Sequence, residues 1–234
     1  MIRDTDFEWA KFVDRWPHPP QSVIDAVDVN RPSRLGIRDS GRVAGEKEHH
    51  HGYFVQRKLT NWNGADYIAA ANYRTRNEVF EAWVKENIST DFVDAGVNYT
   101  VINEVPAGHT EVSTGAHTDI VKDFTAIYLL SNGRNDEKGP PTVFWQEQGH
   151  DVYRPPQTQA QDGSKLTELY RVHIPLRTWV ILEARVLHSV EHLLDTRLAF
   201  QISFLNNPIP DIWETKITHF RNGQTFAAQR HDLA

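Results

Sequence analysis

Two histidines and an aspartate have the residue types and spacing that are typical of a metal site. His117 and Asp119 lie two residues apart in the stretch GAHTDIVKDFTAIYLL. In an extended strand, residues i and i+2 point to the same face, so both side chains can reach one point. His188 lies far along the chain, in the stretch VLHSVEH. Together the three residues predict a two-histidine, one-carboxylate site, which leaves three coordination positions open on one side of Fe(II).

An arginine downstream of His188 has the chemistry to hold an anion beside this metal. Arg197 begins the stretch RLAFQISF, nine residues after His188. Strand alternation puts Arg197, Ala199, Gln201 and Ser203 on one face. A guanidinium grips a carboxylate through two parallel hydrogen bonds. We therefore expect a carboxylate-bearing cosubstrate between the metal and Arg197.

Other histidines are weaker candidates. His109 and Glu111 repeat the spacing of histidine and acid, but they follow a turn signal and no apolar strand begins directly after them. The consecutive histidines 49–51 cannot converge on one ion with an ordinary backbone, so we expect them in a solvated loop. We expect His192 to pack near the site and not to bind the metal.

The elements that position these residues fall into two parts. Residues 1–95 predict helices and loops that support the core, with helices over residues 19–29 and 76–88 and a short strand over residues 52–59. Residues 96–207 change to a period of two and predict the catalytic core, and residues 208–234 predict a C-terminal arm. The eight expected strands are residues 98–106, 115–121, 123–131, 142–146, 169–175, 178–184, 187–194 and 196–206.

This succession predicts a mainly β member of the α+β class. We expect a double-stranded β-helix, which is a cupin-like jelly roll, with the N-terminal helices packed on one sheet. The long interruption at residues 147–169 predicts a functional flap over the mouth of the barrel.

Composition limits the class of protein. The 234 residues suit a single domain, and a net charge of -6 argues against sequence-independent nucleic-acid binding. The chain has no cysteine, so histidine and carboxylate must hold any metal. A mean hydropathy of -0.55 and the lack of a long apolar run predict no membrane partner, and no signal peptide is visible. We expect a cytoplasmic protein.

The same residues resemble the iron(II)- and 2-oxoglutarate-dependent dioxygenases, particularly the branch that holds the isopenicillin N synthase-like and plant oxygenases. The resemblance covers about residues 96–206 and rests on NEVP at Asn103–Pro106, GAHTD followed by FTAIYLL, His188 and Arg197. It implies that His117, Asp119 and His188 bind iron.

The resemblance also implies a cosubstrate pocket. Arg197 would bind 2-oxoglutarate, and Asn103 is a further candidate contact. Ala199 stands where the family has a serine, and Glu104 and Val105 stand where it has aromatic residues. The missing hydroxyl groups are expected from Tyr99, Tyr128 or Ser203.

The implied activity is an oxygenase that uses Fe(II), 2-oxoglutarate and dioxygen, with ascorbate as an optional reductant. Hydroxylation of a small amino-acid-like or specialised metabolite is expected first, followed by desaturation or cyclisation. Two alternatives remain open: an iron oxidase that does not use 2-oxoglutarate, and a non-catalytic cupin-like binding protein. A nucleic-acid demethylase is less favoured, because Ser203 stands where such enzymes commonly carry a second arginine.

Overall fold

The computed structural model describes most of the core and part of the N-terminal region. The described residues are 8–27, 50–53, 58–60, 66–68, 71–93, 96–103, 116–119, 122–132, 139–156, 158–160, 164–190 and 197–217, of which residues 50–76, 98–103 and 132 are described by their backbone alone.

Antiparallel β-sheets make up most of the described structure. The largest sheet has seven strands in the order β1-β10-β7-β12-β6-β5-β2, and a second sheet has the order β11-β8-β9. The strands of the large sheet are β1 (Ala10–Phe12), β2 (His50–Tyr53), β5 (Ala71–Arg76), β6 (Val97–Asn103), β7 (Phe124–Asn132), β10 (Trp179–Glu183) and β12 (Arg197–Phe204). Those of the second sheet are β8 (Thr142–Glu147), β9 (Leu166–Val172) and β11 (Leu187–Val190), while β3 (Lys58–Thr60) pairs with β4 (Asp66–Ile68).

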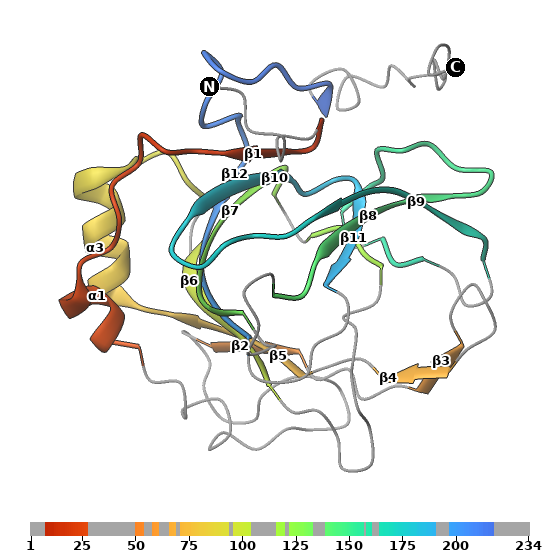
Figure 1. Ribbon diagram of the computed structural model, residues 1–234. Helices are drawn as coiled ribbons and strands as arrows, with labels where there is room; N and C mark the ends of the chain where they lie inside the picture. The colour runs from red at the N-terminus through yellow and green to blue at the C-terminus, as the bar shows by residue number, and fades with distance from the viewer. Residues whose placement is uncertain are drawn as a thin grey trace.

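The large sheet has one face toward the helices and one face toward the second sheet (Figure 1). On the helix side, Phe200 of β12 stacks on Phe80 of helix α3 (Glu78–Asn87), with ring centroids 4.0 Å apart. Because side chains alternate along a strand, Arg197, Ala199, Gln201 and Ser203 point to the opposite face. The predicted division of β12 into a site face and a packing face therefore agrees with the structure.

Helix α3 begins and packs as its sequence dictates. The side chain of Asn77 accepts a hydrogen bond of 2.9 Å from the backbone N–H of Phe80, which caps the first turn. Asn77 also donates to the carbonyl of Ala26, just after helix α1 (Gln21–Asp25), at 2.9 Å. One residue therefore caps the longer helix and joins it to the shorter one.

The strands of the core follow the sequence prediction closely, but the N-terminal region follows it only in part. Seven of the eight expected strands form, and residues 116–119 of the other make isolated bridges to their neighbours. In the N-terminal region, α1 and α3 form within the two expected helices, and the strand expected over residues 52–59 overlaps β2 and β3. The sequence analysis missed β1 and β5, which join the same large sheet as the core strands. The boundary at residue 95 therefore divides a sheet that is continuous. Among the described residues, no helix is long and apolar enough to cross a membrane.

The large sheet holds a buried acid at the end of β10. Glu183 ends β10, is 1% exposed and lies opposite Phe124 of β7. Burial raises the pKa of Glu183 to about 7, although hydrogen bonds from Thr215 and Tyr153 oppose the rise. Thr215 belongs to the predicted C-terminal arm, whose described part buries Ile209, Trp213 and Ile217 in the core.

We expect Glu183→Gln to stabilise the protein at pH 8 and to have little effect at pH 5. The pKa of this carboxyl rises from 4.5 to about 7, so the folded chain holds the proton more tightly than the unfolded chain. The stability that the proton provides is complete below pH 4.5 and is lost as the pH rises through 7. At about 1.4 kcal/mol per pKa unit, the gain at pH 8 is at most about 3 kcal/mol. Chemical denaturation at both pH values measures it, and an equal effect at both would contradict the assignment.

Candidate metal centre

Two backbone hydrogen bonds bring His117 and His188 together. The N–H of His117 donates to the carbonyl of His188 at 3.0 Å, and the N–H of His188 donates back to His117 at 2.9 Å. This is the hydrogen-bonded pair of an antiparallel ladder, in which directly opposite side chains point to the same face. The two imidazole rings accordingly lie with centroids 4.9 Å apart.

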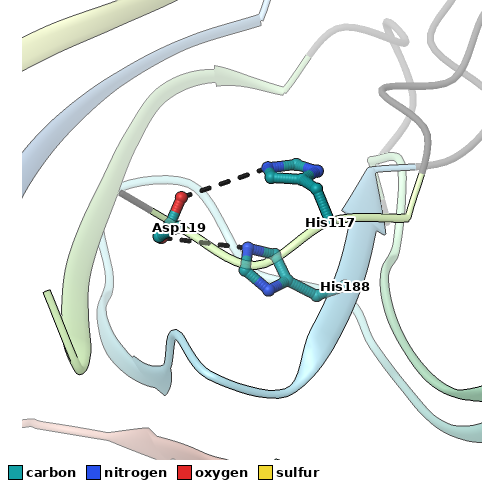
Figure 2. A group of neighbouring side chains, drawn as sticks. All are labelled: His117, Asp119 and His188. Atoms are coloured by element: carbon teal, nitrogen blue, oxygen red, sulfur yellow. Dashed lines mark ion pairs between the residues drawn. The ribbon is translucent and has the colours of Figure 1, made fainter. Parts of the chain in front are cut away.

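Asp119 joins this pair because it is two residues beyond His117 on the same face. Its Oδ1 is 4.0 Å from Nε2 of His117, and its Oδ2 is 3.9 Å from Nε2 of His188. Each residue offers one ligand atom, and the three atoms lie within 4.8 Å of one another (Figure 2). The three residues that the sequence selected therefore converge on one point and could hold a metal ion.

His188 is prepared to act as a neutral ligand. Its Nδ1 is 2.9 Å from the carbonyl of Val186, so Nδ1 carries the proton and the lone pair of Nε2 faces Asp119. Burial lowers the pKa of His188 to about 4, and the charge of Asp119 only partly opposes this. The imidazole is therefore uncharged near neutral pH, as metal coordination requires.

Thr125 and Lys122 hold one oxygen of Asp119. Oδ2 accepts a hydrogen bond of 2.8 Å from Oγ1 of Thr125 on β7, and Nζ of Lys122 lies 3.2 Å from the same atom. Asp119 is 5% exposed, while the side chain of His117 is 28% exposed. The site is thus closed on the side of Asp119 and opens beside His117.

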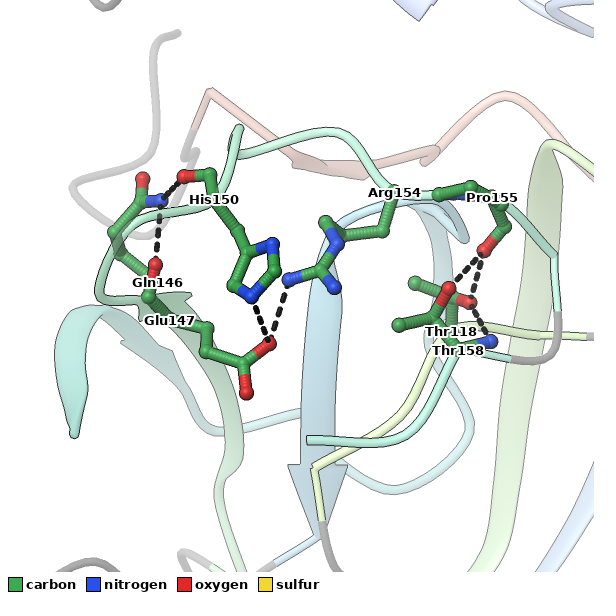
Figure 3. Close-up of polar contacts among 7 residues, drawn as sticks. All are labelled: Thr118, Gln146, Glu147, His150, Arg154, Pro155 and Thr158. Carbon is green, nitrogen blue, oxygen red and sulfur yellow. Dashed lines mark hydrogen bonds and ion pairs between the residues drawn. The ribbon is translucent and has the colours of Figure 1, made fainter. Parts of the chain in front are cut away.

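Residues 154–156 and 158–160 form a second support, on the other side of the ligand strand (Figure 3). The N–H of Thr118 donates to the carbonyl of Thr158 at 2.8 Å, and the N–H of Ala160 donates to Ala116 at 2.9 Å. Oγ1 of Thr118 accepts from the N–H of Thr158 at 2.9 Å and donates to the carbonyl of Pro155 at 2.7 Å. Thr118 lies between the two ligand residues of its strand, so these bonds fix both.

The segment of the predicted flap, residues 147–169, is fastened to the core at its start. Arg154 donates from Nη1 to the buried carboxylate of Glu147 at 2.6 Å, and Gln146 donates to the carbonyl of His150. These contacts, seen in Figure 3, fasten the start of the segment to the end of β8. β9 already begins at Leu166. The described parts of the segment hold the ligand strand in place, and a closing movement of the segment over the site stays a prediction.

Polar side chains of β12 face the same interior as the metal centre. Ser203 lies directly opposite Thr125, whose side chain contacts Asp119. Arg197 is 3% exposed, and burial lowers the pKa of its guanidinium to about 10, so it stays charged at neutral pH. Within the described part of the chain, its Nε has no hydrogen-bond partner and no carboxylate forms an ion pair with it. Gln201 is 8% exposed, and its Oε1 likewise has no partner there.

One predicted cosubstrate contact, Tyr128, is not brought to this face. Tyr128 pairs with Phe200 on the helix side of the sheet, where its hydroxyl is 3.2 Å from Nδ1 of His18. Its ring packs on Trp179, with centroids 4.9 Å apart. Tyr128 therefore belongs to the packing under the N-terminal segment, and strand alternation would have given the same answer. Asn103 ends β6, opposite Ala71, and its side chain is outside the described residues.

The weaker candidates lie outside the parts of the chain whose side chains are described. This holds for His109, Glu111, the histidines 49–51 and His192, and equally for Tyr99, Glu104 and Val105. Gln201 is the residue that the sequence analysis placed on the site face without giving it a role.

Comparison with known proteins adds little to these residues. No protein-family model matches the chain, and no curated protein sequence matches it. Among solved structures, the chain aligns with one described as an oxidoreductase of the 2OG-Fe(II) oxygenase family from Burkholderia pseudomallei. The alignment covers 84% of this chain and 87% of that chain, with 8% identity and a TM-score of 0.33. A likeness of this degree carries no argument about activity, which is argued below from the residues.

We expect Thr118→Val to weaken metal binding about tenfold. The substitution keeps the size of the side chain but removes the hydroxyl that accepts from Thr158 and donates to Pro155. Groups that orient metal ligands are typically worth about 10- to 100-fold in affinity. Titration of the apoprotein with Co(II) measures the effect.

Thr158→Val is the matched control. It removes the bond from Oγ1 of Thr158 to Pro155 but leaves the backbone N–H that donates to Thr118. Its dissociation constant for Co(II) should stay within about twofold of wild type. Equal affinities in all three proteins would count against the support role of Thr118.

Proposed function

We propose that this protein is a non-haem Fe(II)- and 2-oxoglutarate-dependent oxygenase that acts on a small amino-acid-like or specialised metabolite. The observation that carries the proposal is the convergence of His117, Asp119 and His188 at one buried point. Two imidazoles and one carboxylate are the ligand set of non-haem iron oxygenases. The nearby buried arginine supports the choice of cosubstrate.

The three residues fit a divalent metal with small adjustments. Neighbouring ligands of a six-coordinate ion lie about 3 Å apart when each bond is about 2.1 Å. The Asp119 oxygens lie 4.0 and 3.9 Å from the two imidazoles, and all three ligand atoms lie within 4.8 Å of one another. Side-chain movements of about 1 to 2 Å would therefore complete the site. When bound there, Fe(II) would supply the activation of dioxygen that is coupled to decarboxylation of 2-oxoglutarate.

Arg197 supports a dicarboxylate cosubstrate. It is a charged group in the interior without an anionic partner among the described residues, and burying such a charge is costly unless something compensates it. The distal carboxylate of 2-oxoglutarate would provide that compensation through two parallel hydrogen bonds. The chain would thereby orient the cosubstrate toward the metal.

Gln201 is better placed than Ser203 to assist Arg197. Six residues separate Arg197 from Ser203, about 20 Å along an extended strand, which is too far for both to hold one carboxylate. Gln201 is four residues from Arg197, and the small side chain of Ala199 lies between them. An anion above Ala199 would be within reach of the guanidinium from one end and the amide N–H from the other. The amide would then take the part of the serine that this sequence lacks.

The strand order supports a double-stranded β-helix for the core. The large sheet has β10, β7, β12 and β6 side by side, and the second sheet has β9, β8 and β11. Residues 116–119 bond to β11 and so extend the second sheet to a fourth position. Two facing sheets of four antiparallel strands are the plan of a jelly roll, with the metal centre between them.

We expect 2-oxoglutarate to give a visible charge-transfer band when it is added anaerobically to the Fe(II)-loaded protein. His117→Ala should abolish the band, because it removes a ligand. Arg197→Gln should raise the 2-oxoglutarate concentration for half-maximal absorbance about 100-fold, because the charged partner of the carboxylate is lost. Arg171→Gln, which breaks an exposed pair with Glu168 on β9, is the matched control and should titrate as wild type does.

The outcome also separates the alternatives. Iron binding without a band, together with oxygen consumption that depends on an added substrate alone, would favour the oxidase that does not use 2-oxoglutarate. Metal binding with neither a band nor oxygen consumption would favour a cupin-like binding protein. Succinate release in the presence of candidate amino acids and metabolites would then identify the substrate, and ascorbate can be tested as the reductant in the same assay.

We expect Gln201→Leu to weaken 2-oxoglutarate binding about tenfold and leave Fe(II) binding unchanged. The leucine fills a similar volume but offers no N–H, and a hydrogen bond to a charged group is worth about 1.5–3 kcal/mol. Ser203→Ala is the control on the same face and should leave the titration unchanged. If Ser203→Ala had the larger effect, the assignment of Gln201 would be wrong.

A further inference from the structure

Lys122 is a deeply buried lysine that contacts the metal-ligand candidate Asp119. It is 1% exposed, and its Nζ lies 3.2 Å from Oδ2 of Asp119. Lysine is almost never buried to this extent unless it is paired. The sequence alone gives Lys122 no role, because it lies in the short connection between the ligand strand and β7.

The carboxylate of Asp119 has a different environment at each oxygen. Oδ2 is held by Thr125 and Lys122, while Oδ1 is directed toward His117 (Figure 2). One oxygen is thus fixed by the protein, and the other faces the ring that would share a metal ion with it. The carboxylate is oriented before any metal is present.

Charges around Asp119 balance without a metal. A second buried pair lies next to the first: Nε of Arg185 is 2.7 Å from Oδ1 of Asp123, which is fully buried. Burial lowers the pKa of Arg185, and the negative charge of Asp119 partly opposes this. Among the described residues, two acids therefore face two bases, and a divalent cation bound between the histidines would add two positive charges close to Lys122.

We propose that Lys122 is a built-in counter-ion that stabilises Asp119 before metal binding and competes with the metal for its charge. The inference rests on the metal site of the proposed function. It assigns Lys122 a positioning role: the lysine keeps the empty site folded, and its positive charge lowers the affinity for a divalent cation. A lysine that served only to fill space or to stabilise the fold would leave metal affinity unchanged on removal.

The test compares wild type with Lys122→Met as metal-free protein and during titration with Co(II). Lys122→Met should lower the thermal midpoint of the metal-free protein, because Asp119 is left with an uncompensated buried charge. It should also bind Co(II) at least about tenfold more tightly, because the competing charge is gone. The rise in thermal midpoint on adding Co(II) should then be larger than in wild type.

Two further variants isolate the effect of charge. Lys122→Gln keeps a donor for Oδ2 but not the charge, so it should also bind Co(II) more tightly, and it serves if Lys122→Met does not fold. Lys85→Met breaks the pair with the buried carboxylate of Glu81 on α3, at 2.8 Å, away from the metal centre, and should leave the Co(II) affinity unchanged.

Equal or weaker Co(II) binding by the folded Lys122 variants would overturn the inference and leave the proposed function standing. Failure of wild type to bind Co(II) or Fe(II) would overturn the proposed metal centre and the inference together. A wild type that binds metal but gives no signal with 2-oxoglutarate would overturn the cosubstrate alone, and the comparison of Co(II) affinities would still decide the role of Lys122.

Discussion

The reciprocal pair of backbone hydrogen bonds between His117 and His188 is the contact on which the rest of the site depends. It sets the register between two segments that are far apart in the sequence, and the register decides which side chains share a face. A slip of one residue would turn His117 and Asp119 away from His188. Hydrogen bonds from residues 158–160 on one side and from β11 on the other stabilise that register.

The site is buried and charged around Asp119 and is accessible at His117. Asp119 lies among Thr125, Lys122 and Arg185, where its charge is matched before any ligand arrives, while the His117 side chain is exposed enough for a substrate to approach. The side chains of the site are therefore already ordered in the protein without ligand, so ligand binding does not lose free energy in ordering them. The positive charge of Lys122 holds Asp119 in place, but it also lowers the affinity of the site for a divalent cation.

The interior face of β12 also carries buried polar side chains, farther from the metal ligands. Arg197 and Gln201 bring polar atoms into this interior, and Nε of Arg197 and Oε1 of Gln201 have no hydrogen-bond partner among the described residues. Buried polar groups in folded proteins are nearly always satisfied, so the charged guanidinium of Arg197 supports an anionic ligand in the proposed site. The small side chain of Ala199 between them, which departs from the family resemblance, becomes part of the same explanation because it leaves room for an anion.

The sequence by itself determined the strands of the core, the two faces of β12 and the identity of the three converging residues. These follow from the alternation of side chains, which is a property of the local backbone. The tertiary structure alone decided what each face meets. β2 and β5 are short and polar and become strands only by pairing with their neighbours in the large sheet. Thr118 and Lys122 gained their roles from contacts with Pro155, Thr158 and Asp119, and residues 154–156 and 158–160 became a support because they pair with the ligand strand. Such pairings join distant segments, and no local period in the sequence specifies them.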